Sequence, residues 1–459
     1  MKLCEYAGSL RGKRIAVCGI GISNTPLIEL LLQNGCEVTA RDRRERAALG
    51  ELAERLEAGG ARLILGADYL RDLDGDVIFR TPGIMPWQPE LAAATARGAR
   101  LTSEMEAFFE VCPCKIIAVT GSDGKTTTTS VIAALLRAEG YTAHIGGNIG
   151  APLLTRADAM RETDYAVLEL SSFQLMTMTQ SPDVAVVTNV APNHLDIHRD
   201  MDEYTAAKRA IFEHQSERGR LVVNYDNRTT RGFADGARGE VIYFSRKTRP
   251  EKSVYLDGGT IMDATGGSRE KILEVSDIFI PGVHNIENYM AAAAATRGLV
   301  SNETLRRTAR EFQGVAHRIE LVRELRGVRY YNDSIASSPS RTIAGLRSFD
   351  RKVILIAGGK DKGVPFDELG PEVVAHVKTL VLTGLTAERI RDAVTRCKEY
   401  GGSPEIILEP DFALAVKAAS DAASAGDTVI LSPACTSFDR FKNFEERGNY
   451  FKELINGID

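Results

Sequence analysis

KIIAVTGSDGKTTTTS, residues 115–130, joins a run of β-branched residues to a glycine-containing loop and then to a helical pattern, VIAALLRA. Gly121 and Gly124 permit the tight backbone turn that directs N–H groups at phosphate oxygens, and the start of the following helix adds positive potential. We expect Lys125 to reach the β- and γ-phosphates and the Thr126 hydroxyl to hold Mg²⁺. The loop fits the usual G-x-x-x-x-G-K-[ST] spacing only loosely. The flanking strand and helix nevertheless predict a phosphate-binding loop rather than an ordinary turn.

The composition is that of a globular protein with room for several domains. The chain has 459 residues, of which 44% are hydrophobic and 26% charged, and a net charge of −5, which favours neither a nucleic acid nor an anionic membrane as partner. No apolar run approaches the roughly 20 residues that span a bilayer, and MKLCEYAGSLRGKR lacks an apolar signal core. Seven cysteines without a framework spacing predict reduced thiols and a cytoplasmic protein. Cys112 and Cys114 have neither a redox nor a zinc spacing and are interpreted as ordinary thiols.

The N-terminal pattern is typical of a dinucleotide-binding α/β fold. Strand-like residues 14–18 and 37–40 enclose a glycine turn and a helical segment over residues 25–33. Asp42 follows at about the distance of the usual ribose-binding acid. Because the third glycine of the fingerprint is missing, the pattern supports the fold and not a nicotinamide cofactor. Residues 81–83, TPG, form a turn that could touch a ligand at the carboxyl edge of the sheet.

Downstream of the phosphate loop, polar residues follow several strand-like runs. Asn148 lies in the glycine-rich HIGGNIG, and Glu169 stands between two leucines at the end of a buried strand. An unpaired carboxylate would be energetically unfavourable there, so we expect Glu169 to bind a metal ion. His194 follows the next strand, and Lys208 lies in the helix after it; alone, each would more often be structural or exposed. Asn285, in the first turn of an alanine-rich helix, could contact a base or a sugar.

The C-terminal part contains five strand-like runs separated by helical segments, with polar residues at their ends. This pattern predicts a second doubly wound sheet. The fold class is therefore α/β with three domains. We expect a Rossmann-like domain over residues 1–103, a central P-loop ATPase-like domain with a parallel sheet over 104–314, and a Rossmann-like doubly wound domain over 315–459.

Taken together, these motifs closely resemble those of the Mur ligases, the ATP-dependent amide-forming enzymes of peptidoglycan precursor synthesis. TGSDGKTTT, GGNIG, LELSSFQL, NHLD, AHRIE, NDS, GGKDKG and LSPACTSFDRFKNFEERG occur in family order across nearly the whole chain. The last motif is similar to that of members that add D-glutamate to UDP-N-acetylmuramoyl-L-alanine. The Asp-Asn-Pro-Arg motif of relatives that add diamino acids is not found.

The resemblance implies that the N-terminal domain binds the UDP part of the acceptor, with Asp42 near the uracil. It implies that the central domain binds ATP. The implied acceptor-binding residues are Gly21, Ile22, Ser23, Asn24, Asp42, Thr81, Pro82, Gly83 and Asn148. The implied nucleotide-binding residues are Gly121, Ser122, Asp123, Gly124, Lys125, Thr126, Thr127, Asn285 and Arg318.

The resemblance also implies two Mg²⁺ ions, one held by Thr126 and Glu169 and the other by His194 and a carbamylated Lys208. Carbamylation turns a cation into an anion, as a position between metal ions requires. The residues implied to hold D-glutamate or close over it are Arg318, Ser337, Lys362, Ser437 and Phe444. The residues with an implied catalytic role are Lys125, Glu169, His194, Lys208, His317 and Asp333.

The implied reaction begins when ATP phosphorylates the carboxylate of the L-alanyl end, because a carboxylate is a poor electrophile. The deprotonated amine of D-glutamate then attacks the acyl phosphate, and a tetrahedral intermediate releases phosphate and leaves an amide. Since acyl phosphates hydrolyse in water, we expect hinges near residues 103 and 314 to let the C-terminal domain close first. We expect the protein to act as a monomer.

The chain departs from the family pattern at three positions. Asp123 stands where the phosphate loop usually has Asn, and Arg43 replaces a small polar residue near the implied UDP site. Ile335 follows NDS where the family has Lys; Arg341 could supply the missing cation.

Three other functions remain as alternatives. One is another amide ligase of the same group, such as a folylpolyglutamate synthase, which the C-terminal SPAC…RG motif disfavours. Another is a nucleotide-binding regulatory protein without catalysis, suggested by Ile335 alone. A nicotinamide dehydrogenase fits the first domain, but a second and stronger phosphate site follows it.

Overall fold

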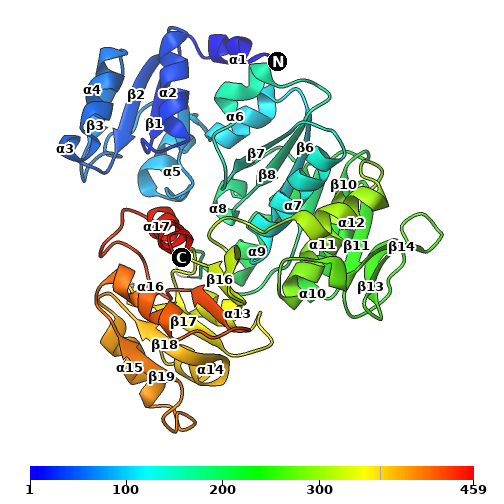
Figure 1. The fold of residues 1–459 in the computed structure, drawn as a ribbon. Helices are drawn as coiled ribbons and strands as arrows, with labels where there is room; N and C mark the ends of the chain where they lie inside the picture. Colours follow the sequence, from blue (N-terminus) through cyan, green and yellow to red (C-terminus); the bar gives the residue numbers. More distant parts are fainter. Residues whose placement is uncertain (196, 362, 459) are drawn as a thin grey trace. The chain divides into compact units, whose positions relative to one another are not determined.

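The computed structural model describes residues 1–195, 197–361 and 363–458, and these residues form three β-sheets (Figure 1). The predicted α/β class is confirmed. The chain divides into two compact units: Met1–Asp277 with Ile286–Arg310, and Ile278–Asn285 with the residues from Glu311 onward. In the described part of the chain, no helix is long and apolar enough to cross a membrane.

The first unit begins with a parallel sheet in the order β3-β2-β1-β4-β5. Both faces are covered, because Val17 packs into one core with Leu27 while Ala16 packs into another with Leu91. The strand order reverses beside β1, where doubly wound folds place their ligands. The strands are β1 Arg14–Cys18, β2 Glu37–Asp42, β3 Arg62–Leu65, β4 Val77–Arg80 and β5 Arg100–Thr102. The helices are α1 Leu3–Ser9, α2 Asn24–Gln33, α3 Arg46–Leu49, α4 Glu51–Ala58 and α5 Pro89–Ala96.

The second sheet of this unit has nine strands in the order β14-β13-β12-β11-β10-β9-β6-β8-β7. The strands from β7 to β12 in this order run parallel, as predicted, and β13 and β14 extend the sheet as antiparallel strands. The strands are β6 Lys115–Thr120, β7 Ala143–Gly147, β8 Tyr165–Glu169, β9 Val184–Val187, β10 Arg220–Asn224, β11 Glu240–Ser245, β12 Ser253–Asp257, β13 Thr260–Asp263 and β14 Glu270–Glu274. Its β6, β8 and β9 carry the predicted phosphate-loop and metal residues at their carboxyl ends.

Helices connect these strands. α6 ends just before β6, and α7 begins directly after the phosphate loop (Figure 1). α9 starts at an N-cap in which the Asp200 side chain accepts from the N–H of Glu203. The helices are α6 Glu104–Val111, α7 Lys125–Ala138, α8 Ser172–Leu175, α9 Met201–Glu213, α10 Arg228–Gly232, α11 Val283–Ala295 and α12 Asn302–Glu311.

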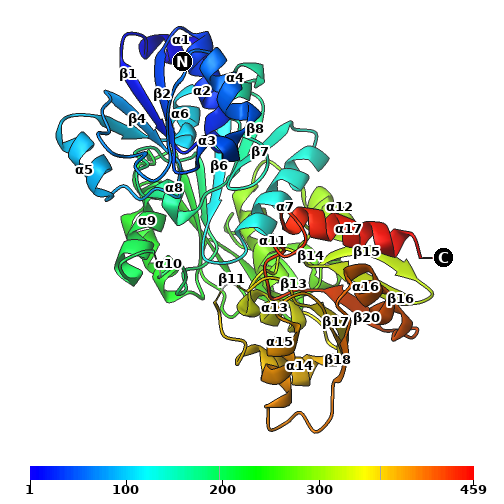
Figure 2. The same ribbon diagram turned by 90° about the vertical axis from the view of Figure 1, so that its left-hand side faces the viewer.

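The second unit contains a six-stranded sheet in the order β15-β16-β20-β17-β18-β19. Tyr331 and Leu355 face a core shared with α13, α14 and α15, whereas Tyr330 and Ile354 face a core shared with α16 and α17. Figure 2 labels these helices. The strands are β15 Glu320–Leu325, β16 Val328–Asn332, β17 Val353–Ala357, β18 Val377–Leu382, β19 Glu405–Leu408 and β20 Thr428–Leu431. The helices are α13 Pro339–Leu346, α14 Leu369–His376, α15 Ala387–Thr395, α16 Phe412–Asp421 and α17 Phe444–Asn456.

The doubly wound form of this sheet is the predicted one, but β15 is an additional strand. It pairs antiparallel with β16 at the edge of the sheet. Its sequence, ELVREL, is only partly buried, so it lacks the continuous apolar run by which the other strands were predicted. This strand could not be predicted from the sequence pattern, because it lies at the edge of the sheet and is only partly buried.

Candidate active site

The phosphate loop joins β6 to α7, as predicted. Gly121 has φ +150°, and a Cβ atom there would lie 1.9 Å from Oγ1 of Thr188, so only glycine fits. Nζ of Lys125 donates to the carbonyl oxygens of Gly121 and Ser122, each at 2.9 Å. The ammonium group therefore lies over the loop, where it can meet phosphate oxygens.

Asp123, the departure within this loop, is anchored by its backbone. Its N–H donates to Oδ1 of Asn189 at 2.9 Å, and its carbonyl oxygen accepts from Oγ1 of Thr188 at 2.5 Å. The residue is exposed. The neighbouring Ser122 hydroxyl lies 3.0 Å from the Tyr204 hydroxyl. The loop is thus held by residues that follow β9 in the chain.

Glu169 is the centre of a small oxygen-rich cluster. The Thr126 hydroxyl donates to Oε2 of Glu169 at 2.7 Å, and Nδ2 of Asn148 donates to Oε1 at 2.9 Å. Glu169 is only 2% exposed. A carboxylate and a hydroxyl in contact fit Mg²⁺, which takes oxygen ligands and keeps several from water and phosphate. Among the described residues, no group of three or more His, Cys, Asp or Glu could hold a metal ion.

Lys208 is buried against the same loop, with 1% of its surface exposed. Its Nζ donates to the carbonyl oxygen of Gly121 at 2.8 Å and lies 4.5 Å from the centre of the Tyr204 ring. Burial lowers the pKa of Lys208 to about 6, and the nearby Lys125 cation adds to this effect. The helical pattern alone favoured a surface residue, whereas the structure buries Lys208 beside the loop; its role in the site stays a prediction.

The two histidines after β9 differ in environment. His194 is exposed, has φ +55°, and its ring lies 5.2 Å from that of Phe173. His198 is buried and stacks on Phe173 with an interplanar angle of 8°. Its Nε2 lies 2.9 Å from the Ser172 hydroxyl, and its Nδ1 3.3 Å from Oε1 of Glu203. His198 was not among the residues predicted from the sequence; its position four residues after His194 is the available signal.

In the nucleotide region, the structure adds a residue that sequence reasoning did not select. Asn288 accepts from the Thr128 hydroxyl at 3.1 Å, and a Cβ atom at Gly124 would lie 2.5 Å from its Oδ1. The predicted Asn285 donates to the carbonyl oxygen of Pro281 at 2.6 Å. Thr127 is buried within the first turn of α7.

The predicted acceptor-binding turn assembles at the carboxyl edge of the first sheet. Gly19 has φ +94°, and a Cβ atom there would lie 2.6 Å from Cγ2 of Thr81, so this turn packs against the TPG turn. Nδ2 of Asn24 donates to the carbonyl oxygen of Gly19 at 2.8 Å. Ile22, at the tip, is 83% exposed. The remaining predicted residues of these two turns are Gly21, Ser23, Pro82 and Gly83.

Asp42 lies in this turn region but is already paired. It accepts from the N–H of Ile20 at 2.7 Å and from the Arg44 guanidinium at 2.8 Å. Burial raises the pKa of Asp42, but the hydrogen bonds from Arg44 and Ile20 hold it below its usual value. Arg44, which sequence reasoning did not select, therefore belongs to the same region.

In the second unit, Asp333 is buried at the carboxyl end of β16. It accepts from the Ser432 hydroxyl at 2.7 Å and from the N–H of Ile319 at 3.3 Å. Burial raises the pKa of Asp333 to about 7, while Ser432 and Arg318 act in the opposite direction. Nε of Arg318 is buried and has no hydrogen-bond partner among the described residues.

His317 and Phe444 meet in this region, with ring centres 5.9 Å apart. Nδ1 of His317 lies 2.9 Å from Nδ2 of Asn332, and burial lowers the pKa of His317. The buried Arg447, not selected from the sequence, donates from Nε to the Ser334 hydroxyl at 3.0 Å. Of the other predicted residues, Ser437 is buried, the N–H of Ser337 donates to the carbonyl oxygen of Ile335 at 2.8 Å, and Lys362 lies outside the described residues.

Comparisons with known proteins show the family to which the chain belongs. The family model of the Mur ligase middle domain matches residues 119–296, and that of the Mur ligase glutamate ligase domain matches residues 317–435. A crystal structure of the UDP-N-acetylmuramate-alanine ligase MurC from Thermotoga maritima has a TM-score of 0.59 at 18% identity and covers 97% of this chain and 99% of its own. The chain belongs to the Mur ligase family and is an ATP-dependent ligase of peptidoglycan synthesis.

Two curated relatives indicate which members of this family the chain resembles. A UDP-N-acetylmuramoylalanine–D-glutamate ligase from Acetivibrio thermocellus is 52% identical over 462 residues, which cover 100% of this chain and 99% of the relative. A protein with the same name from Clostridium novyi is 48% identical over 456 residues, 99% of each chain.

Proposed function

We propose that this protein joins D-glutamate to UDP-N-acetylmuramoyl-L-alanine through an acyl phosphate formed from ATP. The full-length similarity to ligases of that name supports the substrates. The observation that carries the chemistry is the contact of Glu169 with Thr126 and Asn148 beside the phosphate loop. These residues bring a metal-binding carboxylate and a hydrogen-bond donor to the place where a terminal phosphate would lie.

Lys125 neutralises charge on the phosphates, because its ammonium already lies over the loop. Asn148 orients the acceptor near the transferred phosphate. On the second unit, Arg318, Ser337, Ser437, Phe444 and Lys362 hold or cover D-glutamate in this proposal. His317 and Asp333 line the nucleotide and acceptor side.

Mg²⁺ fits the Thr126 and Glu169 oxygens, and it supplies charge neutralisation for phosphoryl transfer when bound. We place a second ion at His194 and a carbamylated Lys208. The burial of Lys208 supports this assignment, because it lowers the pKa of the amine to about 6 and carbamylation requires the neutral amine. A ¹³C-bicarbonate NMR experiment tests it: a carbamate resonance should appear in the wild-type protein and disappear in Lys208→Ala. Identical spectra for the two proteins would exclude carbamylation of Lys208.

The Gly21–Asn24 and TPG turns bind the UDP part of the acceptor in this proposal.

We further propose three domains with boundaries near residues 103 and 314. The C-terminal domain closes before the acyl phosphate forms. The proposal also includes a monomeric state and a cytoplasmic location. Small-angle scattering with and without ATP and both substrates tests closure, since an unchanged radius of gyration would contradict it.

Phosphate release from ATP tests the proposed reaction directly. The protein is assayed with UDP-N-acetylmuramoyl-L-alanine and with D-glutamate, L-glutamate, L-lysine or diaminopimelate. Release should depend on D-glutamate and yield a product of matching mass. Release with another amino acid would contradict the proposed substrate but not the proposed mechanism. ATP binding without any phosphate release would favour a regulatory protein.

A further inference from the structure

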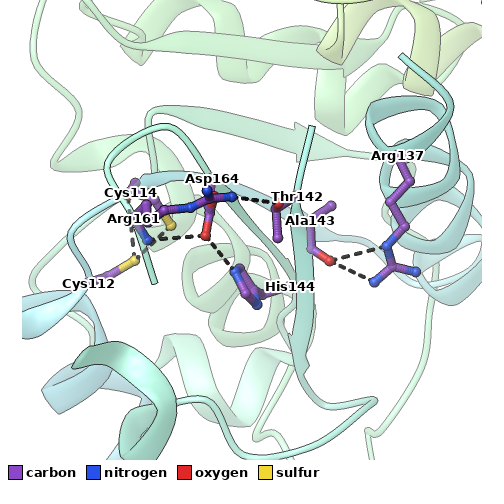
Figure 3. Close-up of polar contacts among 8 residues, drawn as sticks. All are labelled: Cys112, Cys114, Arg137, Thr142, Ala143, His144, Arg161 and Asp164. Carbon is purple, nitrogen blue, oxygen red and sulfur yellow. Dashed lines mark hydrogen bonds and ion pairs between the residues drawn. The ribbon is translucent and has the colours of Figure 1, made fainter. Parts of the chain in front are cut away.

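Cys112 and Cys114 lie side by side in the segment that joins α6 to β6 (Figure 3). Their Sγ atoms are 3.6 Å apart and in hydrogen-bond contact. The Cys112 thiol also lies 3.5 Å from the carbonyl oxygen of Cys114. The sequence spacing alone predicts ordinary thiols, but spacing along the chain does not report the distance between the sulfurs.

The backbone holds the two sulfurs in this arrangement. Cys112 is extended, with φ −62° and ψ 118°. The pyrrolidine ring of Pro113 fixes the φ angle of that residue at about −65°. The 3.6 Å separation of the Sγ atoms shows that the two side chains point to the same side of this segment. The two thiols therefore lie together in the reduced protein, and a disulfide requires the sulfurs to approach from 3.6 Å to about 2.05 Å.

The surroundings distinguish the roles of the two thiols. Cys112 is half-buried and Cys114 is 7% exposed. The hydrogen bond from Cys112 lowers the pKa of Cys114, against the opposing effects of burial and the Asp164 carboxylate. Asp164 is itself held by His144, at 3.0 Å, and by Arg161 (Figure 3). Because the Cys112 thiol also donates to the carbonyl oxygen of Cys114, its hydrogen points toward Cys114, and we assign Cys114 as the nucleophile and Cys112 as the neighbour that resolves its oxidised form.

We propose that Cys112 and Cys114 are a reversible dithiol–disulfide site that takes hydrogen peroxide as its oxidant. The Cys114 thiolate attacks one peroxide oxygen, the O–O bond breaks, and with a proton from solvent the products are a sulfenic acid and water. The Cys112 sulfur then attacks Sγ of Cys114 and expels hydroxide, which takes the Cys112 proton and leaves as a second water. Two thiols are oxidised, one peroxide is reduced to two waters, and a thiol reductant reverses the change.

This site is independent of the proposed ligase reaction. The ring that it closes spans only three residues, so it restrains the unfolded chain little and suits a modification rather than a stabilising cross-link. Of the seven cysteines, the other five provide single thiols; among the described residues no second pair of cysteine sulfurs is in hydrogen-bond contact.

Peptide mapping of the full chain tests the proposal. Trypsin cuts after Arg100 and Lys115, so both cysteines fall on the peptide of residues 101–115. After one equivalent of hydrogen peroxide and alkylation, this peptide should lack two hydrogens and carry no alkyl group. Dithiothreitol should restore both alkylation sites. If both sulfurs remain alkylatable under conditions that oxidise the exposed Cys4, or gain oxygen without a linkage, the proposal is overturned.

Single variants separate the two roles. In Cys112→Ser, Cys114 should stop at a sulfenic acid that dimedone traps. In Cys114→Ser, Cys112 should react no faster than Cys4; faster reaction would contradict the assignment of the nucleophile.

Phenylarsine oxide provides a probe that needs no oxidant, because it binds paired thiols. Wild-type protein should gain one arsenical on the 101–115 peptide and either variant none, whereas binding that survives in a variant would show that the sulfurs do not act as a pair.

Discussion

The Thr126 hydroxyl lies 2.7 Å from Oε2 of Glu169, and this contact joins the phosphate loop to the end of a neighbouring strand. It places a hydroxyl and a carboxylate where one cation can bind both. Thr126 follows β6 and Glu169 ends β8, and these two strands are paired in parallel. Parallel pairing therefore brings their carboxyl ends, and with them the two side chains, to the same edge of the sheet.

Glu169→Gln should reduce kcat/KM for ATP-dependent ligation by about 100-fold or more, because the amide has nearly the same shape but no charge for a cation. The change should raise the Mg²⁺ concentration needed for half-maximal activity. Both quantities are measured by phosphate release at varied Mg²⁺. The exposed Glu162→Gln, before the same strand, is the matched control. Equal Mg²⁺ dependence in the two variants would contradict a metal role for Glu169.

Lys208→Met should abolish most of the ligase activity while the protein remains folded. The substitution removes a buried nitrogen that contacts the phosphate loop and replaces it with an apolar chain of similar length. Steady-state turnover and thermal unfolding are measured together. Arg209→Met, on the next residue of the same helix, removes a surface pair with Glu213 and should leave turnover nearly unchanged. A similar small effect in both variants would show that Lys208 has only a structural role.

His198→Phe should lower kcat about 10-fold through positioning rather than direct chemistry. Phenylalanine preserves an aromatic stack on Phe173 but loses the contacts with Ser172 and Glu203. The loss should fall on kcat more than on the KM for ATP, and His198→Gln should recover part of it by restoring a polar contact. The exposed His214→Phe serves as control. An unchanged kcat with a lowered unfolding temperature would limit His198 to stability.

Arg341→Ala should cost more activity than loss of an ordinary surface arginine. Nη1 of Arg341 donates to the carbonyl oxygen of Ile335 at 3.2 Å, so its cation lies beside the position where the family has lysine. We expect a several-fold loss in kcat/KM for D-glutamate. The comparison variant is Arg347→Ala, which breaks only an exposed pair with Glu372. Turnover near that of the wild type in Arg341→Ala would contradict the hypothesis that Arg341 supplies the cation missing at Ile335.

Stability should fall as pH rises from about 4.5 to about 7, in part because of Glu104. Burial raises the pKa of Glu104 from 4.5 to about 7 in the folded protein. Between these values the folded state binds more protons than the unfolded state, so the free energy of unfolding decreases with pH. The shift corresponds to at most about 3 kcal/mol. Above about pH 7 this contribution stays constant.

Thermal unfolding from pH 4.5 to 8 measures this effect. Glu104→Gln should flatten the decline, since its amide does not ionise. Glu110→Gln, on the same helix α6 but half-buried, should retain the wild-type slope. Parallel pH profiles for wild type and Glu104→Gln would refute the assignment.

Much of the fold could be predicted because its signals are local. The strand over residues 14–18, the phosphate loop and the doubly wound C-terminal pattern each depend on apolar runs and glycines close together in sequence. β15 could not be predicted in this way, because ELVREL is a partly buried edge strand defined by its pairing with β16. The pairing of Asp42 with Arg44 was also missed, because a ribose-acid spacing does not reveal which neighbours already occupy the carboxylate.

The amino-acid sequence by itself determined the order of elements, the phosphate loop and the membership in the Mur ligase family, because motifs in fixed order carry that information. Only the tertiary structure decided the environments of single side chains. It buried Lys208 against Gly121, placed His198 between Phe173 and Tyr204, and brought the two sulfurs of the CPC segment together. The physical reason is that burial and hydrogen bonding depend on atoms from distant segments and on backbone angles, neither of which residue spacing records.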